Sequence, residues 1–384
     1  MRWRTVLVLG GGVGGTVAAT RLRAGLPRSD RVVLVEREAL HLFQPSLLWL
    51  AVGSRRPEAI QRSFDRLRRR GVDVVQATVE SIDPARRSIR AGDLELIGDA
   101  IVVALGADLA ADALPGLQDA GHNLYTLQGA TALRDALAAF RGGRIVILTA
   151  TPLYKCPAAP YEAAMLIDAA LRHRGVRGHT QLDLYSAEPG PMGVTGPAVS
   201  GAVRRLVESK GIQYQPEHQI SRADRAARRV EFANGATAEF DLLVYVPPHR
   251  APAVARDAGL TNASGWIPVD RHVFETEHRG VYAIGDVTVV PLAMGKPLPK
   301  AGVFAHEQAE VVAANLIGEW TGRGARREFG GYGKCFLETG DGKAGIGAGA
   351  FYAEPTPQVA LRVPTQWWHW AKVLFERRWF WKWF

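Results

Sequence analysis

Two cysteines are the residues of this 384-residue chain best suited to redox chemistry. Cys156 begins the run Cys-Pro-Ala-Ala-Pro-Tyr-Glu, and Cys335 follows the run Gly-Gly-Tyr-Gly-Lys. Neither lies in an apolar periodic stretch, so the alternative of two unrelated core thiols is disfavoured. Lys155 and Lys334 adjoin them, and a neighbouring ammonium lowers a thiol pKa and favours the reactive thiolate. The pair therefore predicts thiol–disulfide chemistry, and no metal site is expected, because no histidines accompany the cysteines.

An N-terminal strand–helix–strand unit is predicted to bind a dinucleotide. Apolar runs indicate buried strands over 5–9 and 31–36, with a helix over 16–24 between them. The turn after the first strand has the G-x-G-x-x-G spacing, which lets the backbone approach a pyrophosphate at the helix N-terminus. An acid closes the second strand, where it can accept a hydrogen bond from a ribose. The predicted binding residues are Gly10, Gly12, Gly15 and Glu36.

Two later segments indicate that the dinucleotide is FAD. Residues 99–107 read as a strand that runs into a glycine turn at Gly106, and residues 280–287 read as a strand ending in Gly285-Asp286. An acid at that position can hydrogen-bond the ribityl hydroxyls of FAD. Both segments resemble the paired motifs of the two-dinucleotide-binding flavoprotein superfamily, and this resemblance extends from residue 5 to about 318.

A second Rossmann-like unit is predicted to keep its fold without the usual ligand. A strand over 143–149 is followed by the turn 150–162, which contains prolines and lacks the glycine fingerprint. We therefore expect no NAD(P)H site there. The α/β alternation continues, with helices and strands expected over 161–173, 181–188, 197–210 and 242–246. The predicted fold class is α/β, with two Rossmann-like domains and a small C-terminal membrane-docking region.

Four segments together resemble the sulfide:quinone oxidoreductases. The run 156–162 resembles the signature loop of that family, which the flavin subunit of flavocytochrome c sulfide dehydrogenase shares. Residues 43–53, which include Pro45, resemble its flavin-contacting segment, and residues 299–302 resemble its helix entry beside the flavin. Cys335 matches its second redox cysteine.

The resemblance implies a mechanism and two further catalytic residues. Cys156 and Cys335 would form a disulfide, hydrosulfide would attack it, and two electrons would pass through FAD to a quinone. Glu162 matches the family's base, and a carboxylate stabilising the first turn of a helix is its alternative role. Lys300 precedes a helix expected over 301–317 and would stabilise negative charge on reduced flavin, with a surface lysine as the alternative.

The sequence departs from the family in two places. Many members carry a third cysteine before the signature loop, whereas residues 123–129 have none. The growth of long sulfur chains is therefore not expected, and another donor thiol is an open alternative. No cysteine adjoins Phe43 or Gln44, so the FAD is expected to be non-covalent.

The last residues, 366–384, are expected to form an amphipathic helix that lies on a membrane, with packing on the chain's own core as the alternative. One helical face is aromatic and apolar: Trp367, Trp370, Ala371 and Leu374. Another is polar: His369, Lys372 and Glu376. The basic residues suited to anionic headgroups are Lys372, Arg377, Arg378 and Lys382. Candidates for an apolar quinone slot, or equally for core packing, are Phe336, Phe351 and Tyr352.

Composition limits the remaining possibilities. Hydrophobic residues are 47% and charged residues 22% of the chain, which excludes a disordered or disulfide-stapled protein. The net charge of 47 − 38 = +9 suits an anionic partner surface. The start Met1-Arg2-Trp3-Arg4 has no signal-peptide pattern, which predicts the cytoplasmic side of the cell membrane. The basic run from Arg62 to Arg70 is expected to be a solvated helix face without a nucleic-acid module.

We therefore expect an FAD domain over 1–115 and 265–330, a cysteine-loop domain over 116–264 and a C-terminal region over 331–384. The expected function is sulfide:quinone oxidoreduction by a peripheral membrane enzyme, and a homo-oligomer is compatible with the sequence. Three alternatives stay open: a type II NADH:quinone dehydrogenase, a cytochrome c-linked sulfide dehydrogenase and an idle FAD-binding membrane module.

Overall fold

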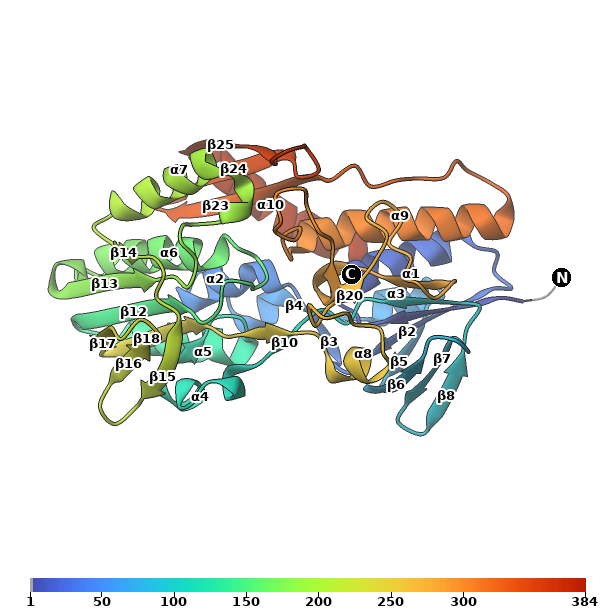
Figure 1. The fold of residues 1–384 in the computed structure, drawn as a ribbon, viewed down its shortest axis with the longest axis horizontal. Helices are drawn as coiled ribbons and strands as arrows, with labels where there is room; N and C mark the ends of the chain where they lie inside the picture. Colours follow the sequence, from blue (N-terminus) through green and yellow to red (C-terminus); the bar gives the residue numbers. More distant parts are fainter. Residues whose placement is uncertain (1–2) are drawn as a thin grey trace.

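The computed structural model describes residues 3–384, and Met1 and Arg2, part of the expected N-terminal pattern, lie outside the described residues. Two parallel sheets form the frame, one in each half of the elongated molecule (Figure 1). The first has the order β21-β9-β1-β2-β5, from Val281–Ala283, Ala100–Val103, Thr5–Leu9, Arg31–Glu36 and Asp73–Gln76. In this sheet β21, from late in the chain, pairs with β9 beside strands from the start of the chain.

Helices and a small antiparallel sheet cover this first sheet. Helix α1 (Val13–Gly25) packs along α9 (Gly302–Thr321), and both flank the glycine turn. The β6-β7-β8 sheet consists of Val79–Asp83, Ser88–Ala91 and Leu94–Ile97. Shorter elements are β3 (Leu40–Leu42), α2 (Leu47–Ala51), β4 (Gln61–Ser63), α3 (Asp65–Arg69) and α8 (Ala253–Asp257).

The second sheet has the parallel order β11-β18-β12-β13-β14, from His122–Asn123, Leu242–Val246, Gly143–Thr149, Thr180–Tyr185 and Gln213–Gln215. Its helices are α5 (Leu127–Ala139), α6 (Ala159–His173) and α7 (Pro197–Glu208). Between β14 and β18 the chain forms a small antiparallel sheet of β15 (Ile220–Asp224), β16 (Arg229–Phe232) and β17 (Thr237–Glu239). Two Rossmann-like sheets thus confirm the predicted fold class, while the domain boundaries stay predictions.

The C-terminal region connects the two halves. Strands β23 (Tyr332–Gly340), β24 (Lys343–Ala350) and β25 (Gln358–Thr365) form an antiparallel sheet, and helix α10 (Gln366–Trp383) follows directly. The Thr365 hydroxyl accepts a hydrogen bond from the Trp368 N–H and caps the helix N-terminus. Strand β23 packs against α6, and α10 runs beside β24 towards the middle of the molecule (Figure 1). Each helix among residues 3–384 is too short or too polar to span a bilayer.

Candidate active site

The two cysteines, far apart in sequence, line one cavity. Cys156 lies in the turn between β12 and α6, and Cys335 lies on β23. The cavity is open to solvent, has a volume of about 670 Å³ when its mouth is included, and is lined mostly by valine, phenylalanine, proline and leucine. Both cysteines are free thiols here, so the implied disulfide stays a prediction.

The cysteine loop is held in a strained and well-anchored conformation. Cys156 has φ = 51°, in the left-handed region that non-glycine residues avoid. Its N–H donates to the Lys300 carbonyl (2.6 Å). The Tyr125 hydroxyl donates to the Lys155 carbonyl (2.7 Å) from the other side. Backbone strain of this kind is typical of functional loops.

The environment of the thiols corrects one expectation from the sequence. Burial raises the pKa of Cys156 well above its ordinary value, and Cys335 and Glu162 add to the effect. Burial likewise raises the pKa of Cys335 to about 12. Lys334 is exposed on β23, and the cation that opposes both shifts is Lys372 of α10. The expected lowering of the thiol pKa values is therefore not found, because burial outweighs the attraction between Lys155 and Cys156.

Three buried ionisable groups and the half-buried His369 connect α10 to this site. Lys372 lies 2.8 Å from a Glu162 oxygen and 4.0 Å from a Glu338 oxygen. The Glu338 N–H donates to Glu162 (2.7 Å), and His369 Nδ1 donates to the Glu338 carboxylate (3.0 Å). Burial lowers the pKa of Lys372, but the two carboxylates outweigh it and raise that pKa overall. Glu162 thus orders the site through an ion pair, and its predicted role as a base stays a prediction.

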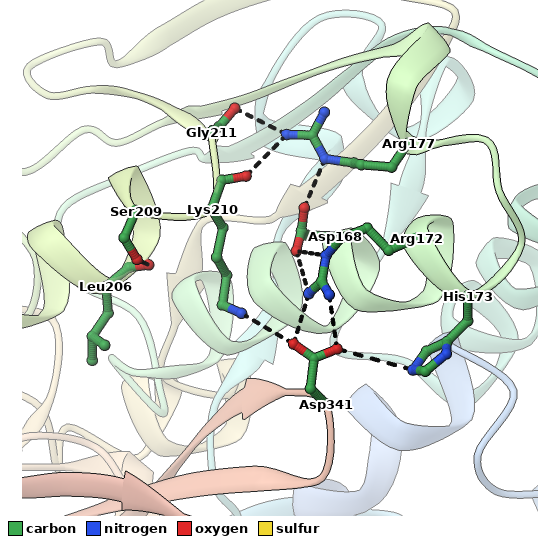
Figure 2. A network of polar contacts seen from close by, with 9 residues as sticks. All are labelled: Asp168, Arg172, His173, Arg177, Leu206, Ser209, Lys210, Gly211 and Asp341. Carbon is green, nitrogen blue, oxygen red and sulfur yellow. Dashed lines mark hydrogen bonds and ion pairs between the residues drawn. The ribbon is translucent and has the colours of Figure 1, made fainter.

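A second network fixes the β23–β24 hairpin on α6 (Figure 2). Arg172 donates to the buried Asp168 (2.8 Å) and to Asp341 (2.8 Å) in the hairpin turn. Gly340 allows the close approach, because a Cβ there would lie 2.8 Å from the Met165 carbonyl oxygen. Since α6 follows Cys156 and β23 carries Cys335, this network holds the two cysteine-bearing elements together.

The acid expected to bind FAD lies between two buried lysines. Burial raises the pKa of Asp286, and Lys155 and Lys300 oppose that shift. The Lys300 ammonium donates to the carbonyls of Asp286 (2.9 Å) and Thr288 (2.7 Å) and lies 3.4 Å from the centre of the Trp266 ring. Burial lowers the pKa of Lys300 to about 7. Lys300 is therefore a buried residue that links this acid to the cysteine loop.

The first sheet provides a cradle that fits FAD. A Cβ on Gly15 would lie 1.7 Å from the Gly10 carbonyl oxygen, so no side chain is possible there. A Cβ on Gly12 or Gly106 would have no atom of the described residues within 4 Å, so the backbone at both positions is open to a ligand. Asp286 Oδ1 is buried without a hydrogen-bond partner among residues 3–384. These features suit a pyrophosphate beside the glycines and a hydroxyl-bearing chain beside the acid.

Three other predicted cofactor residues have the following surroundings. Glu36 accepts hydrogen bonds from the N–H groups of Gly11 and Glu38. Gly285 adopts φ = 75°, and its N–H donates to Gln308. Pro45 is exposed in the short helical turn before α2.

Only two of the three aromatic residues predicted for a quinone slot lie at the same cavity. Phe336 and Phe351 line the cavity that contains the cysteines. The Tyr352 hydroxyl instead donates to the Arg271 carbonyl (2.6 Å), and its ring stacks under that guanidinium. Phe336 contacts Phe375 of α10, with ring centres 6.2 Å apart. Sequence reasoning missed Phe375, whose only signal was its place in the aromatic tail.

Helix α10 has one buried and one exposed face. Its buried residues are Lys372, Glu376, Trp379, Phe380 and Trp383. The expectation that Lys372 faces lipid headgroups is therefore wrong: it pairs with carboxylates inside the protein. Trp379 donates to Nε2 of His41, whose Nδ1 donates to the Gly11 carbonyl of the glycine turn (2.9 Å). Burial lowers the pKa of His41 to about 4, which keeps the imidazole neutral for both contacts.

The predicted solvated arginine run also contacts this helix. Arg62 lies on β4 and stacks over Phe380, 4.2 Å from the ring centre. Arg66 donates to the Trp381 carbonyl (2.5 Å), and Arg70 donates to the Lys382 carbonyl (2.9 Å). These contacts satisfy carbonyls at the C-terminus of α10 and stabilise its dipole. The run is thus partly a helix-capping device, and only part of it is a solvated face.

Comparisons with known proteins agree with this architecture. Residues 4–309 match the pyridine nucleotide-disulphide oxidoreductase family. The chain is 26% identical over 398 aligned positions to a sulfide-quinone reductase of Aquifex aeolicus, covering 98% of this chain and 90% of that protein. It is 24% identical over 349 positions to a mitochondrial sulfide:quinone oxidoreductase of Dictyostelium discoideum, covering 87% and 75%. The solved structure of the Aquifex aeolicus sulfide:quinone oxidoreductase superposes with a TM-score of 0.88 at 24% identity, over 99% and 91% of the two chains.

Two parallel sheets, a dinucleotide cradle and a cysteine loop are the parts of a flavin-dependent disulfide oxidoreductase, and the chain belongs to the pyridine nucleotide-disulphide oxidoreductase family. Within that family, the chain is similar over most of its length to sulfide:quinone oxidoreductases, which confirms the resemblance seen in the sequence.

Proposed function

We propose that this enzyme oxidises sulfide to sulfane sulfur through a Cys156–Cys335 redox pair and passes the electrons through non-covalent FAD to a membrane quinone. The observation that carries the proposal is that the two cysteines, 335 − 156 = 179 positions apart in the sequence, line a single cavity beside the backbone of Lys300. The named relatives act on sulfide and quinone, which supports the same substrates here.

The proposed reaction begins with the cysteines oxidised to a disulfide. Hydrosulfide attacks one sulfur, so that a persulfide forms on that cysteine and the other leaves as a thiolate. A second hydrosulfide then removes the outer sulfur as a disulfide anion, HSS⁻, and leaves a thiol. FAD, when bound, supplies the two-electron oxidant that restores the disulfide and passes the electrons to the quinone.

The protein's own task is to hold anions in an apolar cavity. A thiolate at either cysteine costs free energy because burial disfavours its charge. Lys372 is the cation that offsets this cost, and Glu162 and Glu338 keep it protonated and in position. Tyr125 and Lys300 hold the strained loop, so that Cys156 stays directed at the cavity.

FAD would be held by the glycine turn, Glu36 and Asp286. We infer non-covalent binding because the predicted flavin-contacting segment around Pro45 contains no cysteine. The buried, unpartnered Asp286 Oδ1 is the atom that a ribityl hydroxyl would satisfy. The Lys300 ammonium donates to the backbone carbonyl of that acid.

The exposed face of α10 is proposed to dock on the membrane. Trp367 is 81% exposed, Trp370 62%, Leu374 65% and Trp381 74%. They fall on one side of the helix, opposite the buried face, and tryptophan favours the membrane interface. The adjoining Phe375 leads inward to Phe336, which gives an apolar route from lipid to the site. Quinone entry at this point and location on the cytoplasmic side of the cell membrane are parts of the proposal.

The test is steady-state reduction of a short-chain quinone under anaerobic conditions, with sulfide or NADH as the donor. Sulfide-dependent turnover is expected in the wild type, and Cys156→Ser and Cys335→Ser should each abolish it while retaining FAD. Turnover with NADH but not with sulfide would contradict the proposal. Full sulfide activity in either serine variant would contradict the role of the cysteine pair.

A further inference from the structure

Uncompensated arginines surround the C-terminal half of α10. Arg377 and Arg378 are exposed on the helix itself. Arg69 is exposed at the end of α3, and the neighbouring Arg66 reaches across to the Trp381 carbonyl. The side chains of two separate elements therefore meet around one helix end.

Acidic residues nearby neutralise only part of this cluster. Asp65 pairs with Arg68 at 3.0 Å and attracts Arg69 at longer range, and Glu376 is buried against Arg55. Within residues 3–384 no ion pair involves Arg66, Arg69, Arg377 or Arg378. Like charges gathered on the adjoining elements α3 and α10 raise the local positive potential and favour an anionic partner.

The cluster is continuous with the exposed aromatic face. Trp381 lies one turn beyond Arg377 and Arg378 on the same side of α10, and Trp370 and Leu374 lie on the preceding turns. A surface in which tryptophan and arginine alternate matches a membrane interface, where rings enter the acyl boundary and guanidinium groups meet phosphates. A polynucleotide would leave the apolar half of the surface without a partner.

We propose that Arg69, Arg377 and Arg378 form a binding surface for the phosphate groups of anionic phospholipids. This inference rests on the proposed docking of α10 and adds the lipid class. The apolar face would provide binding to any bilayer, and the arginines would select negatively charged leaflets and orient the helix end towards them. Arg66 and Arg70, which bond the α10 carbonyls, hold α3 beside the helix so that Arg69 adjoins the same surface.

The experiment is sedimentation of the FAD-loaded enzyme with vesicles of phosphatidylcholine alone or mixed with phosphatidylglycerol. The test variant is R69Q/R378Q, because neither side chain makes a hydrogen bond, ion pair or ring contact in residues 3–384. Each arginine near an anionic surface contributes about 1 kcal/mol, so the double variant should bind mixed vesicles about thirtyfold more weakly. Binding to phosphatidylcholine should be unchanged. R86Q/R225Q removes two exposed arginines elsewhere and should bind like the wild type.

Several results would overturn the proposal. If the wild type bound both kinds of vesicle with equal affinity, the proposed lipid selectivity would be wrong although docking would stand. If R69Q/R378Q and R86Q/R225Q lost affinity for mixed vesicles equally, the effect would come from net charge and not from this surface. Equally tight binding of a DNA duplex would favour a different partner. Failure to bind either vesicle would overturn docking as well. Sulfide-dependent reduction of a water-soluble quinone, measured in parallel, separates these results from a failure of the proposed catalytic function.

Discussion

The Lys372 ammonium lies 2.8 Å from Glu162 Oε1, although the two residues are 210 positions apart in the chain. Glu162 belongs to the first turn of α6, directly after the Cys156 loop, and Lys372 belongs to the C-terminal helix. The same Glu162 oxygen accepts the N–H of Glu338 on the strand that carries Cys335. One ion pair thus joins the proposed membrane-docking helix to both cysteine-bearing elements.

Removing the lysine should therefore destabilise the fold and the site together. In Lys372→Met, Glu162 and Glu338 are left buried without their cation, and breaking such a buried pair costs about 3–5 kcal/mol. The free energy of unfolding in urea should fall by that amount. Lys210→Met, which removes a lysine 3.6 Å from a partly exposed aspartate, should cost far less. Equal stability of the two variants would show that Lys372 is not part of a buried network.

The raised pKa of Cys335 predicts slow alkylation of the reduced enzyme at neutral pH. The rate with iodoacetamide should keep rising towards about pH 12 and should not level off near the ordinary thiol value. The folded pKa lies above the unfolded one, so this group's contribution to stability is complete below about pH 8.5 and is lost as the pH rises through about 12. A plateau in the rate near pH 8 would instead indicate an activated thiolate.

Asp286 is predicted to determine how tightly FAD is held. Its Oδ1 is buried without a partner, and losing a hydrogen bond to a charged group costs about 1.5–3 kcal/mol, equivalent to tenfold or more in affinity. Asp286→Ala should therefore lose most of its flavin absorption relative to protein absorption after gel filtration. The surface variant Asp112→Ala is the control and should retain its flavin. Full flavin content in Asp286→Ala would place the ribityl chain elsewhere.

The ion pair that attaches the β23–β24 hairpin to α6 (Figure 2) should make a small but measurable contribution to the free energy of unfolding. Arg172 and Asp341 are both partly exposed, so Asp341→Ala should lower the free energy of unfolding by about 1 kcal/mol or less. Arg172 lowers the pKa of Asp341, so this contribution is present above the unfolded value near pH 3.9 and disappears as the pH falls through the folded pKa. If Asp341→Ala were still less stable than the wild type at pH 2, the loss would come from altered packing of the turn and not from the ion pair.

Features set by short segments were predictable from the sequence. The strand–turn–helix around Gly10 depends on neighbouring residues, and the Gly285-Asp286 strand end is similarly local. The cysteine pair required the family resemblance, because no periodicity relates residues so far apart.

The position of Lys372 could not be predicted in the same way. A lysine on a tryptophan-rich helix suggests a headgroup contact, and only the two carboxylates from α6 and β23 make its burial favourable. His41 is a similar case, since its contacts with Gly11 and Trp379 come from opposite ends of the chain. Long-range polar partners of this kind leave no pattern within either segment.

The most direct test of the central claim is an anaerobic titration of the oxidised enzyme with sulfide, followed by the visible absorption of its flavin. We predict bleaching that is complete at about two sulfides per flavin, since two hydrosulfides give one HSS⁻ and one electron pair, and full recovery on addition of a quinone. Cys156→Ser should show no bleaching with sulfide. A wild-type flavin that stays oxidised with sulfide, or one that bleaches equally well in Cys156→Ser, would contradict the account.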